Sequence, residues 1–279
     1  MNQRTLWALA GALSLTHAPV ASLQAASVAQ PAKSISVPHL PKEAQLVDQV
    51  LVPVPSEVFA VLDKLGKPNW PEVLRPQKAV AAPAGGKEQV SLTLGVVIAE
   101  GFIAVEAENS EEVKNIGNSV RSLAKAIGVE KAVRSRAKSI VEFADKRQWS
   151  EVRKELDLAL ADVRQAMMEL NSESLAQLVS LGGWLRGTEA LATVVGKSYS
   201  KDGAELLHQP VLVEHFNVRL KSLPSDAQKG ELISKILVGL KTIQPLMGGG
   251  GGEHITEKSV KDIGRICAEL VEAAQAKGK

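Results

Sequence analysis

VSLTLGVVIAEGFIAVEA (residues 90–107) and SLAQLVSLGGWLRGTEALATVVG (residues 174–196) are the two stretches that decide the fold. Both are apolar nearly all round, and a helix without a polar face is buried either among other helices or in a membrane. Each stretch carries an ionisable residue near its middle and is interrupted by glycines. We therefore predict that they are two central helices of a bundle and not membrane spans.

The segments between and after these two stretches show the 3.6-residue period of amphipathic helices. Asn109-x-x-Glu112 has the form of a capping box at the start of one such helix. The clearest pattern runs from Trp149 to Leu170, where apolar residues recur at spacings of three and four. No stretch alternates as strands do. The sequence thus predicts an all-α protein, a multi-helix bundle of about eight helices with two central apolar helices and a proline-rich N-terminal arm.

Two later helices are predicted from their first turns. Pro210 suits the first turn of a helix, because its missing N–H is not needed there. Ser225-x-x-Gln228 resembles a capping box, and it predicts a single helix from there to Ile243.

The first thirty residues have the order of a secretory signal peptide. Arg4 precedes the apolar run Leu6–Leu15, and small residues recur from Ala21 to Ala29. The apolar run is too short for a membrane span, which needs about 20 residues. We expect residues 1–25 to be the signal, with cleavage between 22 and 29, and the protein to be exported to a periplasmic or extracellular location.

The remaining chain divides into four parts. Residues 26–87 are rich in proline and are predicted to form an arm with one short helix, anchored by Trp70. The bundle itself is predicted over residues 88–247. The glycine run at 248–252 predicts a flexible linker, and residues 253–279 a C-terminal amphipathic helix. That last helix either closes the core or docks on a partner.

The composition of the 279 residues argues against several classes of protein. The net charge is +2, so no overall field attracts nucleic acid or membrane. Aromatic residues make up 3% of the chain, whereas single-strand nucleic-acid grooves need stacked aromatic faces. Cys267 is the one cysteine, which leaves no internal disulfide. We expect no nucleic-acid partner, no transmembrane segment once the signal is removed, and no cofactor.

Glu100, Arg186 and Glu189 form the first candidate site, because each is a charge within an apolar central stretch. An unpaired charge there would cost several kcal/mol, roughly, so each needs a partner. Pairing Glu100 with Arg186 satisfies both, and Glu189 competes because it lies one turn from Arg186. Three interpretations stay open: an ion pair that fixes helix register, a polar spot at the end of an apolar ligand pocket, or a catalytic carboxylate.

The glycines of the central stretches form the second candidate site. Each glycine costs about 1 kcal/mol in a helix relative to alanine, so something must offset it. Close contact between the helices is one explanation. The other is room for a flat or lipid-like ligand, in a cavity lined by Gly95, Gly101, Gly183 and Trp184.

Histidines form the third candidate site. Glu205, His208 and His215 have the residue types that hold zinc or copper, although they are weak metal candidates. Pro210 stands between the two histidines and is predicted to separate two helices. We therefore expect solvated histidines and no metal.

A basic stretch forms the fourth candidate site. Residues 121–147 contain eight Lys and Arg against three Asp and Glu, and Lys131, Arg134 and Lys138 share one helix face. Such a face is either simply solvated or docks on an acidic partner or an anionic polymer of the cell envelope.

These patterns favour an exported, non-enzymatic helical-bundle protein with a binding or structural role in the cell envelope. Its partner would be an unknown protein or another envelope component. Two alternatives remain: a carrier of an apolar small molecule between the central helices, and an enzyme that uses a buried carboxylate or the histidine pair. The sequence holds no hydrolase elbow, zinc-protease helix or paired CxxC motif, which argues weakly against an enzyme.

Overall fold

The computed structural model describes residues 46–47, 50–51, 68–75, 85–248 and 254–276. All of them lie in one compact unit, Pro41–Lys279. The predicted signal peptide, most of the predicted arm and most of the glycine linker lie outside these residues.

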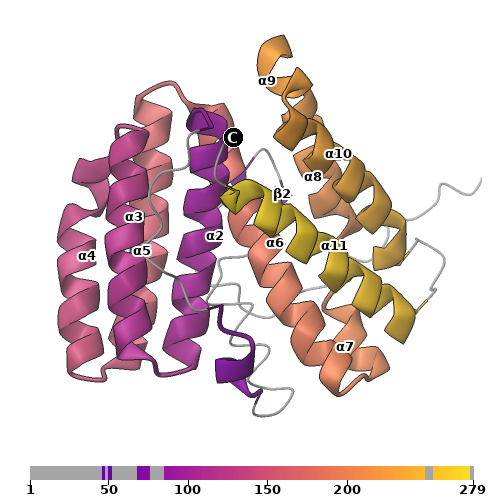
Figure 1. Cartoon of the computed structure of the whole chain (residues 1–279), viewed down its shortest axis with the longest axis horizontal. Coiled ribbons are helices and arrows are strands. Elements are labelled where there is room, and N and C mark those ends of the chain that lie inside the picture. Colours follow the sequence, from indigo (N-terminus) through magenta and orange to yellow (C-terminus); the bar gives the residue numbers. More distant parts are fainter. Residues whose placement is uncertain (1–45, 48–49, 52–67, 76–84, 249–253, 277–279) are drawn as a thin grey trace, which may run out of the picture. The chain divides into compact units, whose positions relative to one another are not determined.

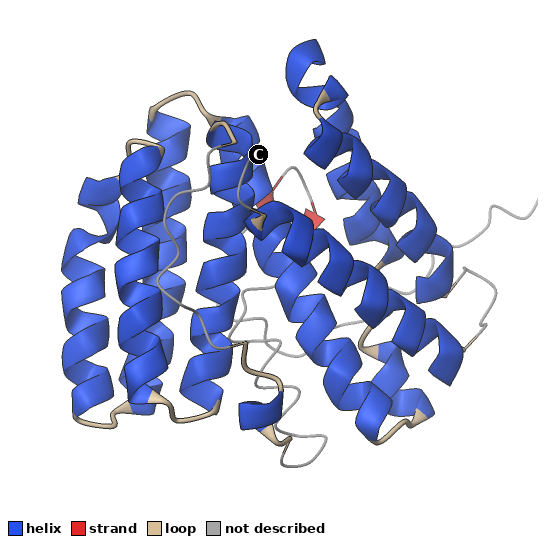
Figure 2. Cartoon of the chain, in the orientation of Figure 1, coloured by secondary structure: helices blue, strands red, loops and turns tan. Residues whose placement is uncertain are grey.

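The described residues form an all-α fold, as the sequence predicts (Figures 1 and 2). Its strands are limited to one antiparallel pair of two residues each. The elements, in chain order, are β1 Leu46–Val47, β2 Val50–Leu51, η1 Trp70–Glu72, α2 Lys87–Glu106, α3 Ser110–Ala126, α4 Glu130–Asp145, α5 Trp149–Glu169, α6 Glu173–Lys197, α7 Lys201–Glu205, α8 Pro210–Lys221, α9 Ser225–Lys229, α10 Glu231–Ile243, η2 Gln244–Met247 and α11 Glu257–Gln275.

The two apolar stretches become α2 and α6, which pack along each other at the centre of the unit. On one side α3 and α5 cover α2, and α4 packs against both of them as the outermost helix. On the other side α11 lies across α6 (Figure 1). Within the described residues, α2 alone is long and apolar enough to cross a membrane, and 89% of its apolar window is buried inside the structure. That burial matches the predicted role of a core helix.

The contact between α2 and α6 is a close approach of the two backbones. A Cβ atom added at Gly95 would lie 1.9 Å from the carbonyl oxygen of Val179, and one added at Gly182 would lie 2.0 Å from that of Leu92. Only hydrogen fits at these two positions. The α6 helix also continues without a break through Gly182 and Gly183.

Short turns connect the consecutive helices α2, α3, α4, α5 and α6, which run antiparallel to one another. The turns contain Glu108, Gly128, Arg147 and Asn171 in the left-handed region, with φ between 51° and 86°. This conformation reverses the chain within a few residues and is typical of helix C-termini. At the start of α3, the Asn109 side chain accepts a hydrogen bond from the backbone N–H of Glu112 at 3.0 Å, so the predicted cap is present.

The single helix predicted from Ser225 to Ile243 is wrong, because the structure divides it at Gly230 into α9 and α10. Gly230 has an extended ψ of 138°, which a helix cannot accommodate. The amide of Gln228 donates to the carbonyl oxygens of Lys221 and Leu223. It therefore binds the end of the preceding helix and does not cap its own.

The C-terminal helix α11 belongs to the core. Its apolar face is buried, and a Cβ added at Gly264 would lie 3.1 Å from the Cβ of Ala192 on α6. Two side chains of α2 bind its end: the Gln89 amide and the Thr93 hydroxyl both donate to the carbonyl oxygen of Ala274, at 3.1 and 2.8 Å. Of the two roles considered for this helix, the structure shows that it closes the core.

Candidate functional site

Glu100 of α2 and Arg186 of α6 meet at the centre of the unit. Their side chains are 0% and 1% exposed, and Nε of Arg186 donates to Oε2 of Glu100 at 2.5 Å. Glu189, one turn further along α6, places its Oε2 3.5 Å from Nη1 of Arg186. The structure thus brings together all three residues of the first candidate site.

Residues 68–75, which we call the strap, complete this charge cluster. The backbone N–H of Arg75 donates to Oε1 of Glu100 at 2.5 Å, and the Arg75 guanidinium donates to Oε1 of Glu189 at 2.6 Å. In return, the carbonyl oxygen of Val73 accepts from Nη2 of Arg186 at 2.6 Å. Backbone and side chain of the strap therefore satisfy groups that α2 and α6 leave open.

The strap is also fixed by apolar and surface contacts. Trp70 and Val73 are buried, at 5% and 6% exposure, and Leu74 packs against the same core. At the surface, Glu72 of η1 pairs with Lys197 at the end of α6. The predicted anchoring role of Trp70 agrees with its burial. Arg75 could not be predicted from the sequence, because its proline-rich surroundings have no helical period.

The electrostatics of the cluster are balanced, with two carboxylates facing two guanidinium groups. Burial raises the pKa of Glu100, and the opposing influences are Arg186 and the N–H of Arg75. Burial, with a smaller contribution from the Glu189 carboxylate, also raises the pKa of the Cys267 thiol. Both carboxylate oxygens of Glu100 accept hydrogen bonds from protein groups, so Glu100 links α2 to α6 and to the strap. Neither oxygen is accessible to a substrate.

Of the two explanations for the glycines of the central helices, the structure favours close contact over a ligand cavity. Gly95 and Gly183 lie where the two backbones touch, since a Cβ on Gly95 would fall 2.7 Å from the nitrogen of Gly183. Trp184 packs against Phe216, with ring centroids 5.6 Å apart, and its indole N–H donates to Oε1 of Gln209 at 2.7 Å. The glycines therefore serve close helix contact.

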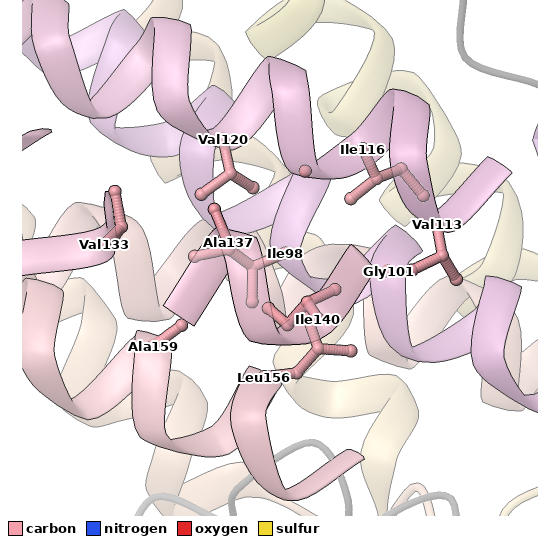
Figure 3. Close-up of a pocket in the computed structure, with 11 residues that line it drawn as sticks. Ile98, Gly101, Val113, Ile116, Val120, Val133, Ala137, Ile140, Leu156 and Ala159 are labelled. Atoms are coloured by element: carbon pink, nitrogen blue, oxygen red, sulfur yellow. The ribbon is translucent and has the colours of Figure 1, made fainter. Parts of the chain in front are cut away.

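Gly101 borders a small cavity that lies elsewhere, between α2, α3, α4 and α5 (Figure 3). Its volume is about 20 Å³ and its lining is apolar: Ile98, Gly101, Val113, Ile116, Gly117, Val120, Val133, Ala137, Ile140, Leu156 and Ala159. A water molecule needs about 10–15 Å³, whereas sites for small molecules measure about 300–1,000 Å³. This space is too small for the flat or lipid-like ligand considered from the sequence.

The three weak metal candidates face different partners. His208 binds the carbonyl oxygen of Met247 through Nδ1 at 2.8 Å, His215 lies 3.3 Å from Oε1 of Gln177, and Glu205 lies 3.4 Å from His254. Over the part of the chain that the structure describes, no three His, Cys, Asp or Glu side chains gather as a metal site would require. The expectation of solvated histidines also fails for His215, which is 8% exposed and whose pKa is lowered by burial.

The basic stretch lies on α3 and α4 and faces solvent. On α4, Lys131 is exposed, and the side chains of Arg134 and Lys138 are 67% and 80% exposed. Arg134 and Lys138 lie 3.4 and 3.7 Å from Glu130 and Glu142 of the same helix. We call Lys131, Arg134 and Lys138 the basic face. Its ion pairs are of the exposed kind that contributes little, about 0.3–0.5 kcal/mol each.

Comparisons with protein-family models, curated proteins and solved structures gave no match to this chain.

Proposed function

We propose that the chain is an exported, non-enzymatic helical-bundle protein that binds an acidic component of the cell envelope through its basic face. The export part rests on the signal-like order of Arg4, the apolar run and the small residues that follow. The binding part rests on the surplus of cations over residues 121–147, with Lys131, Arg134 and Lys138 exposed on α4.

The buried charge cluster supports a structural role over a catalytic one. A general acid or base must come within hydrogen-bond reach of its substrate. Glu100 has no exposed surface, and both of its oxygens already bind Arg186 and Arg75. The cluster joins α2, α6 and the strap, so its evident task is to hold the body that carries the basic face.

The charge balance of the segment around the basic face supports the binding role. Residues 121–147 have eight cationic side chains against three acidic ones. One of the eight, Arg136, is bound by Glu155 and Asp162 of α5, but Arg134 and Lys138 pair with carboxylates of their own helix, the half-buried Glu130 and the exposed Glu142. An acidic partner can replace such weak pairs, and its attraction falls as salt is added.

The export proposal is tested by the mature N-terminus. We expect the chain recovered from the exported fraction of its native cell to begin between residues 23 and 30. A full-length chain that still starts at Met1 and stays in the cytoplasm would contradict this part of the proposal.

The binding proposal is tested with poly-L-glutamate as an acidic probe. We expect Lys131, Arg134 and Lys138, changed together to Gln, to weaken binding by about tenfold, since three surface charges contribute about 0.2–1 kcal/mol each. The matched control changes Lys258, Lys261 and Arg265 of α11 to Gln. These residues have the same spacing and similar exposure, but each pairs closely with a carboxylate of α11, at 2.6 to 2.7 Å.

The control should lose less than about half of its affinity, and wild-type binding should weaken steeply with added salt. An equal loss in the two triple variants would mean that net charge alone governs binding. That result, or binding of the wild type that is insensitive to salt, would overturn the assignment of the basic face.

A further inference from the structure

The buried polar attachment of the strap converges on one carboxylate pair, Glu100 and Glu189, and the surface ion pair of Glu72 with Lys197 adds to it. Three hydrogen bonds join the described part of the strap to the charge cluster: Arg75 to Glu100, Arg75 to Glu189, and Arg186 to Val73. Glu100 takes part in this attachment twice, because it binds the backbone of Arg75 directly and also orients Arg186. The strength of the attachment therefore depends on the charge of Glu100.

Protonation of Glu100 would upset the charge balance of the cluster. With Glu100 ionised, two carboxylates face two guanidinium groups; with Glu100 neutral, Glu189 alone must serve both Arg186 and Arg75. The two arginines differ in what they can do then, since their side chains are 1% and 30% exposed. Arg186 is fixed inside the unit, whereas Arg75 can reach water, so Arg75 is the group that gives way.

Other ionisable groups near the cluster do not restore the balance. The groups that act on Glu100 are the charged side chains of Arg186 and Glu189 and the backbone N–H of Arg75. On α11, the Cys267 thiol lies within the influence of Glu189, but burial raises its pKa and keeps it neutral. On α5, Arg153 is engaged by Glu106, further along α2, at 2.6 Å.

We propose that the strap is an acid-releasable cover: protonation of Glu100 detaches residues 68–75 from α2 and α6 while the helices stay folded. Release uncovers the Arg186 side chain and the apolar surface beneath Trp70 and Val73. Burial raises the pKa of Glu100, so release begins at a milder pH than an exposed carboxyl group would allow.

The environment of Trp70 reports on the strap directly. The full chain is labelled with 5-fluorotryptophan, and each resonance is assigned by a single Trp→Phe change. As the pH is lowered, we expect the Trp70 fluorine signal to move to its solvent-exposed position while Trp149 and Trp184 keep theirs and the helical circular dichroism is unchanged. A Trp70 signal that moves only when the whole protein unfolds would overturn the proposal.

Two variants separate release from a general loss of stability. Glu100→Gln fixes the neutral state, and we expect the undocked population at pH 7 to rise by about 10- to 100-fold, the value of a hydrogen bond to a charged group. The matched control is Glu106→Gln, which removes another buried carboxylate of α2, one bound by Arg153 and not by the strap. It should leave the Trp70 signal in place.

If Glu100→Gln does not fold, Arg75→Gln gives the same test from the strap side. Arg75 is partly exposed, and after its replacement Glu189, the carboxylate it binds, still has Arg186 3.5 Å away as an ion-pair partner. We expect it also to raise the undocked population, by about tenfold. A folded Glu100→Gln or Arg75→Gln protein whose Trp70 signal stays native would show that the cluster does not hold the strap.

Discussion

At Gly95 and Gly182, the carbonyl oxygens of the facing helix occupy the space where a side chain would begin. Gly187, which also lies on α6, has no heavy atom within 4 Å of an added Cβ. Three glycines that look alike in the sequence therefore differ in whether their surroundings leave room for a side chain.

We expect Gly95→Ala to lower the free energy of unfolding by about 3 kcal/mol, because overpacking forces the two backbones apart. Gly187→Ala is the matched control and should raise it by about 0.5–1 kcal/mol through helix propensity. Denaturant unfolding of the two variants measures both values. Similar effects in the two would mean that α2 and α6 are not in close contact.

His215 gives the protein a second sensitivity to pH. Burial lowers its pKa in the folded state, so the unfolded chain takes up this proton first as the pH falls. Stability is then lost as the pH drops below about 6.5, the value in the unfolded chain. We expect the free energy of unfolding to fall between pH 7.5 and 5, and His215→Gln to remove part of that fall.

The control for His215 is His254→Gln, since the side chain of His254 is 60% exposed. It should leave the pH dependence of stability as in the wild type. If both histidine variants behave like the wild type, the burial of His215 has no consequence for stability.

The sequence predicted the meeting of Glu100 with Arg186 because a charge in an apolar helix must find a partner, and few partners exist. It could not predict Arg75 or Val73, since the partners on the strap are set by where an aperiodic segment crosses the helices. Nor could it decide between helix contact and a cavity at Gly95, because a glycine serves either purpose.

Among the elements, α11 shows most clearly how a segment behind a predicted linker can still belong to the core. It buries Val260, Ile263, Ile266 and Leu270 against the helices that precede it. Its last turn also accepts hydrogen bonds from Gln89 and Thr93 of α2.

We expect a chain ending at residue 252 to lose its cooperative thermal transition or to melt at a much lower temperature. Four buried aliphatic side chains contribute about 1.5–3 kcal/mol each, which equals the net stability of a typical domain. Thermal unfolding followed by circular dichroism tests this. A truncated chain with an unchanged melting temperature would return α11 to the role of a docking helix.

Helix positions were predicted well where the apolar period is long, as in α5, which spans Trp149–Glu169. The split between α9 and α10 was missed, because the Ser225-x-x-Gln228 pattern is compatible with a cap. Local contacts decided otherwise: the Gln228 amide binds the carbonyl groups of Lys221 and Leu223, at and just after the end of α8, and the chain then changes direction at Gly230.

For the whole molecule, the all-α class and the two central helices followed from composition and period alone. The choice between a binding or structural protein, a carrier and an enzyme did not follow from the sequence, because it depends on which groups are buried. The contact of α2 with α6 leaves no room for a carrier's ligand, and the closure of Glu100 by Arg186 and Arg75 argues for structure over catalysis. The basic face remains the feature that a partner would meet.

Native mass spectrometry of the protein recovered from the exported fraction of its own cell tests the central claim most directly. We predict a processed chain that begins between residues 23 and 30 and carries no stoichiometric small molecule. A chain that retains Met1, or a reproducible added mass that leaves on denaturation, would contradict an exported, non-enzymatic protein that acts through its surface.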